Sequence, residues 1–216
     1  MIKEFEKRLL SSFILIPIAI FFIIQGSIFF IFFLCILFLV TSYEWLQMSK
    51  KNNLLKFLGI IFLIFSFYTA FEFRVNEDYK DFLLIIVICI LTDIGGYIFG
   101  KILKGPKLTK ISPNKTYAGV LGSFVLSLIA GLIYINYFSK KEVTDTDHLF
   151  IFSIILFISL ISQIGDLIIS FFKRKAKLKD TGKIIPGHGG LLDRIDGLIF
   201  VFPSIYLSIL VIGAIL

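Results

Sequence analysis

The chain has few cysteines and prolines, and these shortages exclude several classes of protein. Two cysteines occur among 216 residues, and both Cys35 and Cys89 lie inside apolar runs. Neither a disulfide framework nor a cysteine metal pair is indicated, so packing is the expected role of both thiols. Because the five prolines mark no flexible linker and no internal repeat is present, a single domain spanning residues 1–216 is expected.

Charged residues are also scarce, at 17%, whereas hydrophobic residues make up 57% and the mean hydropathy is +0.95. A soluble domain of this length could not bury so much apolar surface in one core, so its solvent is expected to be lipid. We predict an all-α integral membrane protein, a polytopic transmembrane helix bundle of about seven spans. Apolar runs of suitable length lie near residues 10–24, 28–48, 54–73, 81–101, 117–138, 148–172 and 195–216.

The net charge of +7 would suggest a nucleic-acid partner in a soluble protein, but here membrane topology explains it. With the N-terminus inside, the only basic residues on the outer side are Arg74, Lys80, Lys140 and Lys141. The positive-inside rule therefore predicts an N-in, C-out, multi-pass protein of the inner (cytoplasmic) membrane. No nucleic-acid partner is expected, and the basic loops 101–116 and 173–194 should face the cytoplasm.

Asp93 and Asp166 are the only acids that we place well inside the expected spans. A carboxylate at the middle of a membrane helix costs about 2.5–3.5 kcal/mol, so each should face a polar cavity and have a partner. Gln163 and Ser170 share the helical face of Asp166, which favours a functional role. The alternative is an acid near the helix end that extends its carboxylate to the membrane surface.

Two further patterns concern packing. Gly96 and Gly100 form a GxxxG motif, which predicts close helix contact. Tyr43 and Trp45 lie near one end of the run 28–48, where a place in the interfacial aromatic belt is expected.

The segment 170–196 concentrates charges between two apolar runs. Asp193 and Asp196 are three residues apart, so they should share one face of the helix that opens the last span. Two such carboxylates repel unless a cation lies between them, and Mg²⁺ takes one or two carboxylates together with phosphate oxygens. Helix capping is the alternative, but the upstream basic residues favour a metal site.

Those basic residues divide into two groups. Lys173, Arg174 and Lys179 are candidates to contact phosphate, because arginine binds it in bidentate fashion and lysine acts as a point charge. Lys175 and Lys177 fit a positive-inside anchor better.

A turn of proline and glycine surrounds His188. Residues 186–190 read PGHGG, which predicts a flexible turn whose amides approach phosphate closely. Because no second His or Cys is near, we expect His188 to contact phosphate or the leaving group rather than a metal. A hydrogen bond within the loop is the alternative.

The other basic loop ends in Ser112, Pro113, Lys115 and Thr116, just before the run 117–138. Hydroxyls, an ammonium group and helix N-terminal amides can hold an anion there. A basic tether between helices is the alternative, and the absence of GxxxxGK[ST] argues against a P-loop.

The segment 170–196 resembles the signature of the phosphatidate cytidylyltransferase (CDP-diacylglycerol synthase) family. The matching positions are Ser170, Lys173, Arg174, Lys179, Asp180, Gly182, Ile185, Pro186, His188, Gly189, Gly190, Asp193, Arg194, Ile195 and Asp196. The resemblance extends to residues 165–167, 92–101 and 110–116, and more loosely to RLLSS and YEW near the N-terminus. The chain departs from the family pattern SPKKTWEG at Asn114, Tyr117 and Ala118.

The resemblance implies a nucleotidyltransferase that transfers CMP from CTP to phosphatidic acid, giving CDP-diacylglycerol and pyrophosphate. It implies Mg²⁺, with a second cation such as K⁺ beside it, as well as contact with membrane lipid and a homodimer. The catalytic candidates are Lys173, Arg174, Lys179, Asp180 and His188. The substrate-binding candidates are Ser112, Pro113, Lys115, Thr116, Ser170, Gly189, Gly190 and Asp93, and the metal candidates are Asp166, Asp193 and Asp196.

Three alternatives stay open. A CTP-dependent isoprenoid-alcohol kinase or a CDP-archaeol synthase would share the basic loop and the metal acids. A secondary transporter could use Asp93 and Asp166 as an ion path, although the polar residues concentrate on the cytoplasmic side.

Overall fold

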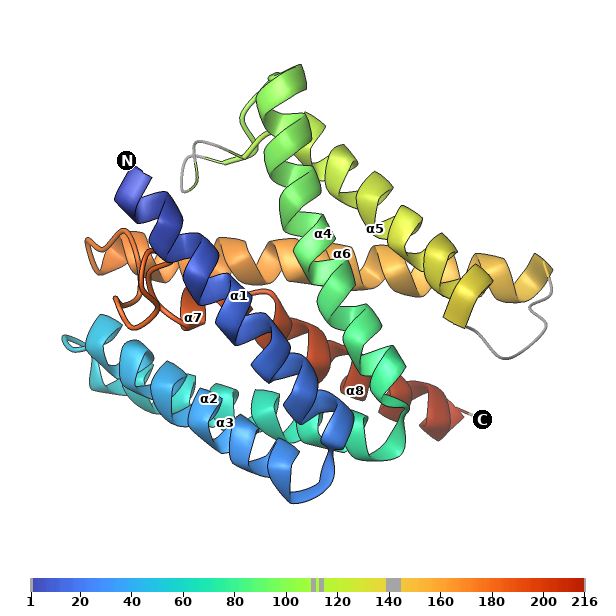
Figure 1. Cartoon of the computed structure of the whole chain (residues 1–216), viewed down its shortest axis with the longest axis horizontal. Coiled ribbons are helices and arrows are strands. Elements are labelled where there is room, and N and C mark those ends of the chain that lie inside the picture. The colour runs from blue at the N-terminus through green and yellow to red at the C-terminus, as the bar shows by residue number, and fades with distance from the viewer. Residues whose placement is uncertain (1, 110–111, 113–114, 139–144, 216) are drawn as a thin grey trace. The chain divides into compact units, whose positions relative to one another are not determined.

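The computed structural model describes residues 2–109, 112, 115–138 and 145–215. In this part of the chain the regular elements are helices. Two isolated antiparallel β-bridges are also present, one between Lys107 and Thr116 and one between Ile185 and Gly189. The helices in Figure 1 are α1 (Ile2–Gln25), α2 (Ser27–Met48), α3 (Asn53–Asn76), α4 (Tyr79–Leu103), α5 (Tyr117–Phe138), α6 (Asp145–Lys175), α7 (Leu192–Ile195) and α8 (Leu198–Ile215).

The chain divides into two compact units, which are described separately here. Unit 1 contains residues 1–79 and 172–216, and unit 2 contains residues 80–171. The two predicted site loops fall in different units, 101–116 in unit 2 and 173–194 in unit 1. The single catalytic domain stays a prediction.

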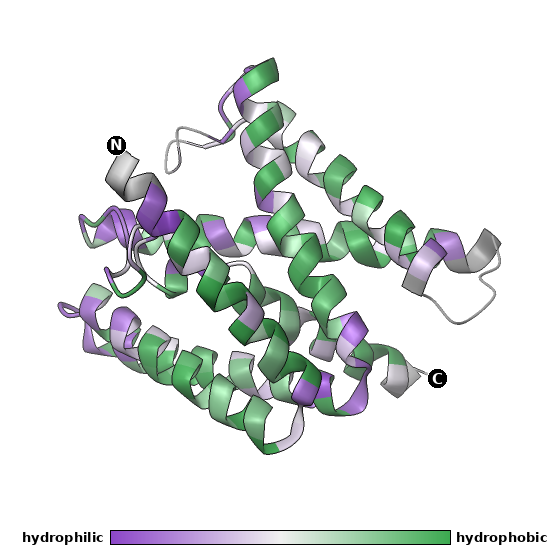
Figure 2. Ribbon diagram, viewed as in Figure 1, coloured by the Kyte–Doolittle hydropathy of each residue, from purple (hydrophilic) through white to green (hydrophobic). Residues whose placement is uncertain are grey.

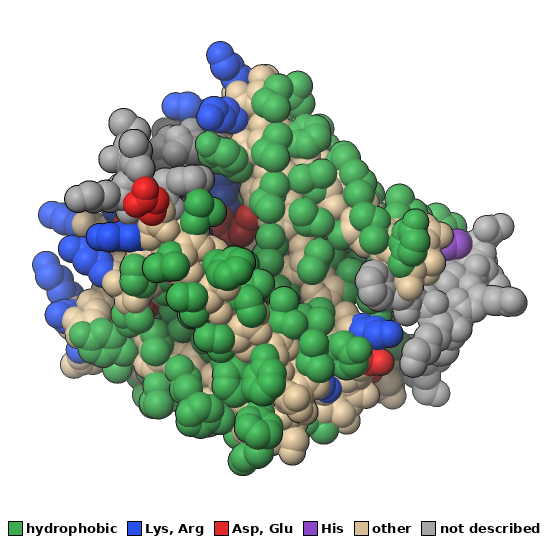
Figure 3. Space-filling model, in the orientation of Figure 1, with side chains coloured by type: hydrophobic (Ala, Val, Ile, Leu, Met, Phe, Trp, Pro, Cys, Tyr) green, Lys and Arg blue, Asp and Glu red, His purple; other side chains and the backbone are tan. Residues whose placement is uncertain are grey.

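The predicted all-α membrane fold is confirmed. Among the described residues, six helices, α1 to α6, are long and apolar enough to cross a membrane, and α8 contributes a shorter apolar helix. Figure 2 shows that hydrophobic residues run along the helices of both units, and Figure 3 shows hydrophobic side chains over much of the face that it draws. Large apolar side chains are well exposed, for example Phe13 at 80% and Ile102 at 71%, as lipid-facing residues require. The number of spans and their orientation stay predictions.

Unit 1 is built from α1 packed on α2, α2 on α3, and α3 on α8. Trp45 of α2 is only 5% exposed. Its indole lies against Gly59 of α3 and donates a hydrogen bond from Nε1 to the Leu55 carbonyl at 3.1 Å. The expected place of Trp45 in the interfacial belt is therefore wrong, because the missing side chain of Gly59 leaves room for the indole inside the bundle.

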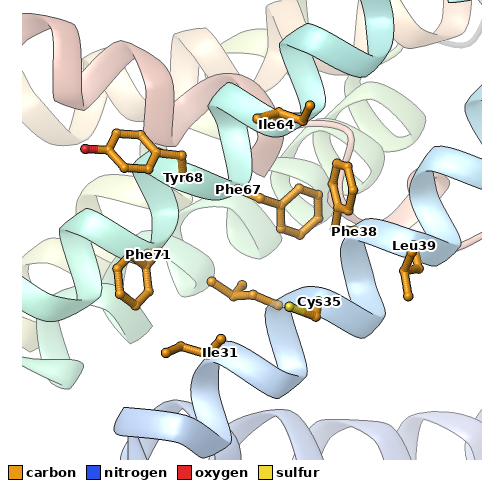
Figure 4. A pocket seen from close by; sticks show the side chains of 9 residues that line it. Ile31, Cys35, Phe38, Leu39, Ile64, Phe67, Tyr68 and Phe71 are labelled. Carbon is orange, nitrogen blue, oxygen red and sulfur yellow. The ribbon is translucent and has the colours of Figure 1, made fainter.

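An apolar pocket of about 460 Å³ lies between α2 and α3 (Figure 4). The rings of Phe38 and Phe67 meet edge to face at 5.7 Å beside it. Its lining residues are Ile31, Leu34, Cys35, Phe38, Leu39, Ile64, Phe67, Tyr68 and Phe71. None of them is charged, so this pocket offers no cation that could neutralise a phosphate.

Unit 2 contains a close contact between α4 and α5. A Cβ added at Gly95 would lie 2.5 Å from the Gly122 carbonyl oxygen and 2.9 Å from the Ser123 Cα. At the motif itself, a Cβ added at Gly119 would lie 2.7 Å from the Gly96 carbonyl oxygen and 3.5 Å from the Gly100 Cα. The close helix packing predicted from the GxxxG motif is confirmed.

This contact predicts that Gly95→Ala destabilises the protein. The added methyl group would meet backbone atoms that cannot rotate away, and such overpacking costs about 1–3 kcal/mol. Thermal unfolding in detergent should show a lower midpoint for Gly95→Ala. Gly213→Ala is the matched control, because a Cβ there meets nothing within 4 Å. Equal midpoints for the two variants would contradict the close contact.

Candidate functional site

Unit 2 contains a polar cavity of about 260 Å³. Residues of α4, α5, α6 and the loop before α5 line it: Thr92, Asp93, Gly96, Tyr97, Ser112, Lys115, Thr116, Gly119, Val120, Ser123, Gln163 and Asp166. Five of the predicted site residues, Asp93, Ser112, Lys115, Thr116 and Asp166, are therefore brought together. Pro113 lies outside the described residues.

The loop before α5 is shaped by its backbone and by Thr116. The Leu108 amide donates to the Lys115 carbonyl at 2.8 Å. The hydroxyl of Thr116 accepts from the Gly119 amide at 3.1 Å, the pattern of a helix N-cap. This cap fixes where α5 begins and holds Lys115 beside the cavity.

Asp166 has the partner that its place in an apolar helix requires. Lys115 Nζ lies 2.5 Å from Asp166 Oδ2, and the Ser170 hydroxyl donates to Oδ1 at 3.2 Å. The predictions that Asp166 faces a polar cavity and that Ser170 shares its helical face are confirmed.

In unit 1, Asp193 organises the 173–194 loop. Lys173 is buried, and its ammonium group lies 2.8 Å from Asp193 Oδ1. Asp193 Oδ2 accepts hydrogen bonds from the amides of Thr181 at 2.8 Å and Gly190 at 3.1 Å. Lys173 thus differs from the other basic residues of the loop, because its charge is already paired within the protein.

Glu44 is a functional candidate that the sequence reasoning missed. This α2 side chain is only 1% exposed. It accepts hydrogen bonds from the Thr181 hydroxyl at 3.0 Å and from the amides of Leu191 at 3.0 Å and Leu192 at 2.8 Å. Glu44 lies near the end of α2, which closes at Met48, so the expectation about acids well inside the spans stays a prediction. The feature of the sequence that could have indicated Glu44 is an acidic residue within the apolar run 28–48.

The turn around His188 has a defined conformation. Pro186 and Gly187 (φ 77°) occupy its centre, and the His188 amide donates to the Ile185 carbonyl at 3.0 Å. Proline followed by a residue with positive φ is typical of a type II turn. The Ile185 amide also donates to the Gly189 carbonyl at 3.0 Å, so the turn forms a small hairpin, and its flexibility stays a prediction.

Helix α1 holds this turn from the side. The Ser11 hydroxyl lies 2.9 Å from His188 Nδ1, and the Ser12 hydroxyl lies 3.3 Å from Nε2. Arg8 Nε donates to the Gly187 carbonyl at 2.7 Å. Burial, and after it the nearby Arg194, lowers the pKa of His188 below its ordinary value of 6.5. The ring is therefore neutral at pH 7 and sits between two hydroxyls.

The other predicted loop residues lie at the surface. Arg174 donates from Nη1 to the Leu178 carbonyl at 3.1 Å, and its side chain is exposed, as are those of Lys179 and Asp180. Lys175 and Lys177 are exposed as well. The proposed division between phosphate contacts and a membrane anchor stays a prediction for these residues.

The two acids of the last motif stay three residues apart on helical backbone, as expected, because Asp196 has φ −58° and ψ −32°. Asp193 lies in α7, which ends at Ile195, and α8 begins at Leu198. Asp196 caps α7, is 7% exposed, and accepts from the Gly197 amide at 3.0 Å. Within neither unit does the described part of the chain bring together three His, Cys, Asp or Glu side chains that could hold one metal ion. The metal roles of Asp166, Asp193 and Asp196 stay predictions.

Comparisons with known proteins agree with the signature in this loop. A model described as the cytidylyltransferase family matches residues 54–212. This chain belongs to that family. The resemblance noted in the sequence is confirmed.

Named relatives of this cytidylyltransferase cover most of its length. The phosphatidate cytidylyltransferase of Rickettsia felis is 34% identical over 206 residues, which cover 92% of this chain and 89% of the relative. The enzyme of the same name from Rickettsia bellii is 33% identical over 204 residues, with 92% and 88% covered. That of Bacillus subtilis is 38% identical over 153 residues, with 69% and 55% covered.

The lowered pKa of His188 predicts how the stability of this cytidylyltransferase depends on pH. In the unfolded chain the imidazole takes up a proton near its ordinary pKa of about 6.5, whereas the folded protein resists protonation. The contribution of the neutral His188 to the free energy of unfolding should be fully present above about pH 6.5. It should be lost as the pH drops from there through the lowered pKa of the folded protein. Thermal midpoints measured on both sides of this value should show the fall. His188→Gln should lack this component and His148→Gln should keep it; the same pH dependence in both variants would contradict the assignment.

Proposed function

We propose that this cytidylyltransferase transfers CMP from CTP to phosphatidic acid. The reaction forms CDP-diacylglycerol and releases pyrophosphate. The observation that carries the proposal is the unit 2 cavity, where Lys115 and Asp166 face hydroxyl groups between membrane helices. The names of the relatives support this choice of substrates.

The chemistry requires positioning and charge neutralisation. A phosphate oxygen of phosphatidic acid attacks the α-phosphorus of CTP, and the bond from this phosphorus to the oxygen that bridges it to the β-phosphorus breaks, releasing pyrophosphate. Nucleophile, electrophile and leaving group are all anionic, so a protein catalyses the step mainly by holding them in line among cations. We assign this role to Lys115 in unit 2 and to Arg174 and Lys179 in unit 1. We keep His188 as a candidate to contact phosphate, which would require it to exchange its contact with Ser11 or Ser12.

The donor chemistry of the unit 2 cavity fits Mg²⁺. Asp93 supplies a carboxylate, and Ser112 and Thr116 supply hydroxyls, all of them the hard oxygen ligands that this ion prefers. Asp166 would join them by exchanging its contacts with Lys115 and Ser170 for the ion. Bound Mg²⁺ would polarise phosphate oxygens and offset their charge.

In unit 1, Asp196 is the better metal candidate. Both oxygens of Asp193 already accept hydrogen bonds, and the ammonium of Lys173 lies where a cation would bind. We therefore propose Asp193 as a weaker candidate for a metal ligand than Asp196. The second cation such as K⁺ and the homodimer stay predictions drawn from the resemblance.

We propose that the reaction takes place on the cytoplasmic side of the inner membrane. In unit 1, the start of α1 and the end of α2 both contact the 173–197 segment, and hydrophilic residues gather at this end (Figure 2). This supports the predicted placement of these segments on one side of the membrane. CTP would arrive from the cytoplasm and phosphatidic acid from the lipid that surrounds the helices.

The first test is an acceptor assay with radiolabelled CTP and purified protein in detergent. Phosphatidic acid, an isoprenoid alcohol and an archaeal diether phospholipid acceptor are supplied in parallel, with and without Mg²⁺. We expect labelled lipid with phosphatidic acid and Mg²⁺, together with release of pyrophosphate. Label found only in the alcohol or the archaeal lipid would overturn the proposal in favour of a kinase or a CDP-archaeol synthase.

A second test concerns the metal. Asp196→Asn removes one negative charge with little change in volume, and it should raise the Mg²⁺ concentration required for half-maximal activity about tenfold or more. Asp78→Asn, at an exposed acid beyond the end of α3, should leave this concentration unchanged. An unchanged Mg²⁺ requirement in folded Asp196→Asn would contradict the metal role.

A further inference from the structure

Glu44 determines which residues can occupy the loop above it. A Cβ added at Gly182 would lie 2.5 Å from Glu44 Oε1, 2.9 Å from Cδ and 3.2 Å from Cγ. A Cβ added at Gly190 would lie 2.6 Å from Glu44 Oε2. These two glycines of the 170–196 signature are thus explained by close approach to a carboxylate on α2.

The same loop is held by Asp193 through neighbouring atoms. Thr181 donates its hydroxyl to Glu44 and its amide to Asp193. The Gly190 amide donates to Asp193, and the next amide, that of Leu191, donates to Glu44. A displacement at Glu44 would therefore move two of the donors that hold Asp193, and Asp193 in turn holds Lys173.

We propose that Glu44 is a positioning residue for the transfer reaction. It acts through the loop, fixing Thr181 and Gly190 so that Asp193 and Lys173 keep their places. The proposal rests on the proposed function, because turnover of CTP and phosphatidic acid is one of its two readouts.

The first experiment compares Glu44→Gln with Glu77→Gln. The amide in Glu44→Gln places an N–H₂ group among donors, so the loop should loosen. We expect kcat to fall about 10- to 100-fold, the scale of loss from a small misplacement of reacting groups. Glu77 is exposed at the end of α3, and Glu77→Gln should keep the parent kcat. Equal activity in the two variants would overturn the proposal.

Limited trypsin digestion gives a readout that does not depend on turnover. The basic residues from Lys173 to Lys183 should be cut faster in Glu44→Gln than in the parent or in Glu77→Gln. If the parent is inactive with CTP and phosphatidic acid, the proposed function fails, while the digestion still tests the position of the loop. Unchanged cleavage of the loop in Glu44→Gln would overturn the positioning role.

A pair of variants covers the case in which Glu44→Gln does not fold. Gly182→Ala should lose activity and protection from trypsin, because its methyl group meets Glu44. Shortening that side chain with Glu44→Asp should relieve the contact, so the double variant should be at least as active and as protected as Gly182→Ala alone. Losses that simply multiply would show that the two sites act independently and would overturn the proposal.

Discussion

Two carboxylates, Asp193 and Glu44, hold the 173–197 segment in its folded form. A buried carboxylate is stable only when its oxygens accept hydrogen bonds, and buried backbone amides equally need acceptors. The amides of Thr181, Gly190, Leu191 and Leu192 meet both needs at once. The loop therefore does not need a large apolar core of its own. Its shape is set because the buried carboxylates need hydrogen-bond donors and the backbone amides of the irregular loop need acceptors.

The same electrostatic rule operates in unit 2. Lys115 and Asp166 form an ion pair without net charge, and Ser170 donates a hydrogen bond to the second carboxylate oxygen. The acid can therefore lie in a helix that is surrounded by lipid. Such a pair also suits the proposed chemistry, because a phosphate that reaches the cavity meets an ammonium group that is already in place. Pairing Lys115 with Asp166 thus lowers the cost of placing a charge in the membrane, and the same lysine can neutralise phosphate. This explains why a transfer between two anions can be carried out among apolar helices.

Part of this could be predicted from the sequence because the rules involved are local. Hydropathy located the long helices, the cost of an acid in lipid predicted a partner for Asp166, and GxxxG predicted that α4 packs closely on another helix. The role of Glu44 could not be predicted in this way, since its donors lie 137 to 148 residues away in the chain. Trp45 was misplaced for a similar reason, because the space that it fills is created by a glycine on another helix.

The last motif shows why spacing alone is an incomplete guide. Asp193 and Asp196 are three residues apart, and on one continuous helix they would project together. The helical backbone continues through Asp196, and the regular helix is interrupted at Gly197, which donates its amide to Asp196. Their partners differ: Asp193 accepts hydrogen bonds from Lys173 and two loop amides, whereas Asp196 accepts one from the Gly197 amide. The two acids therefore do different work: Asp193 folds the loop, and the proposed metal chemistry of unit 1 depends on Asp196.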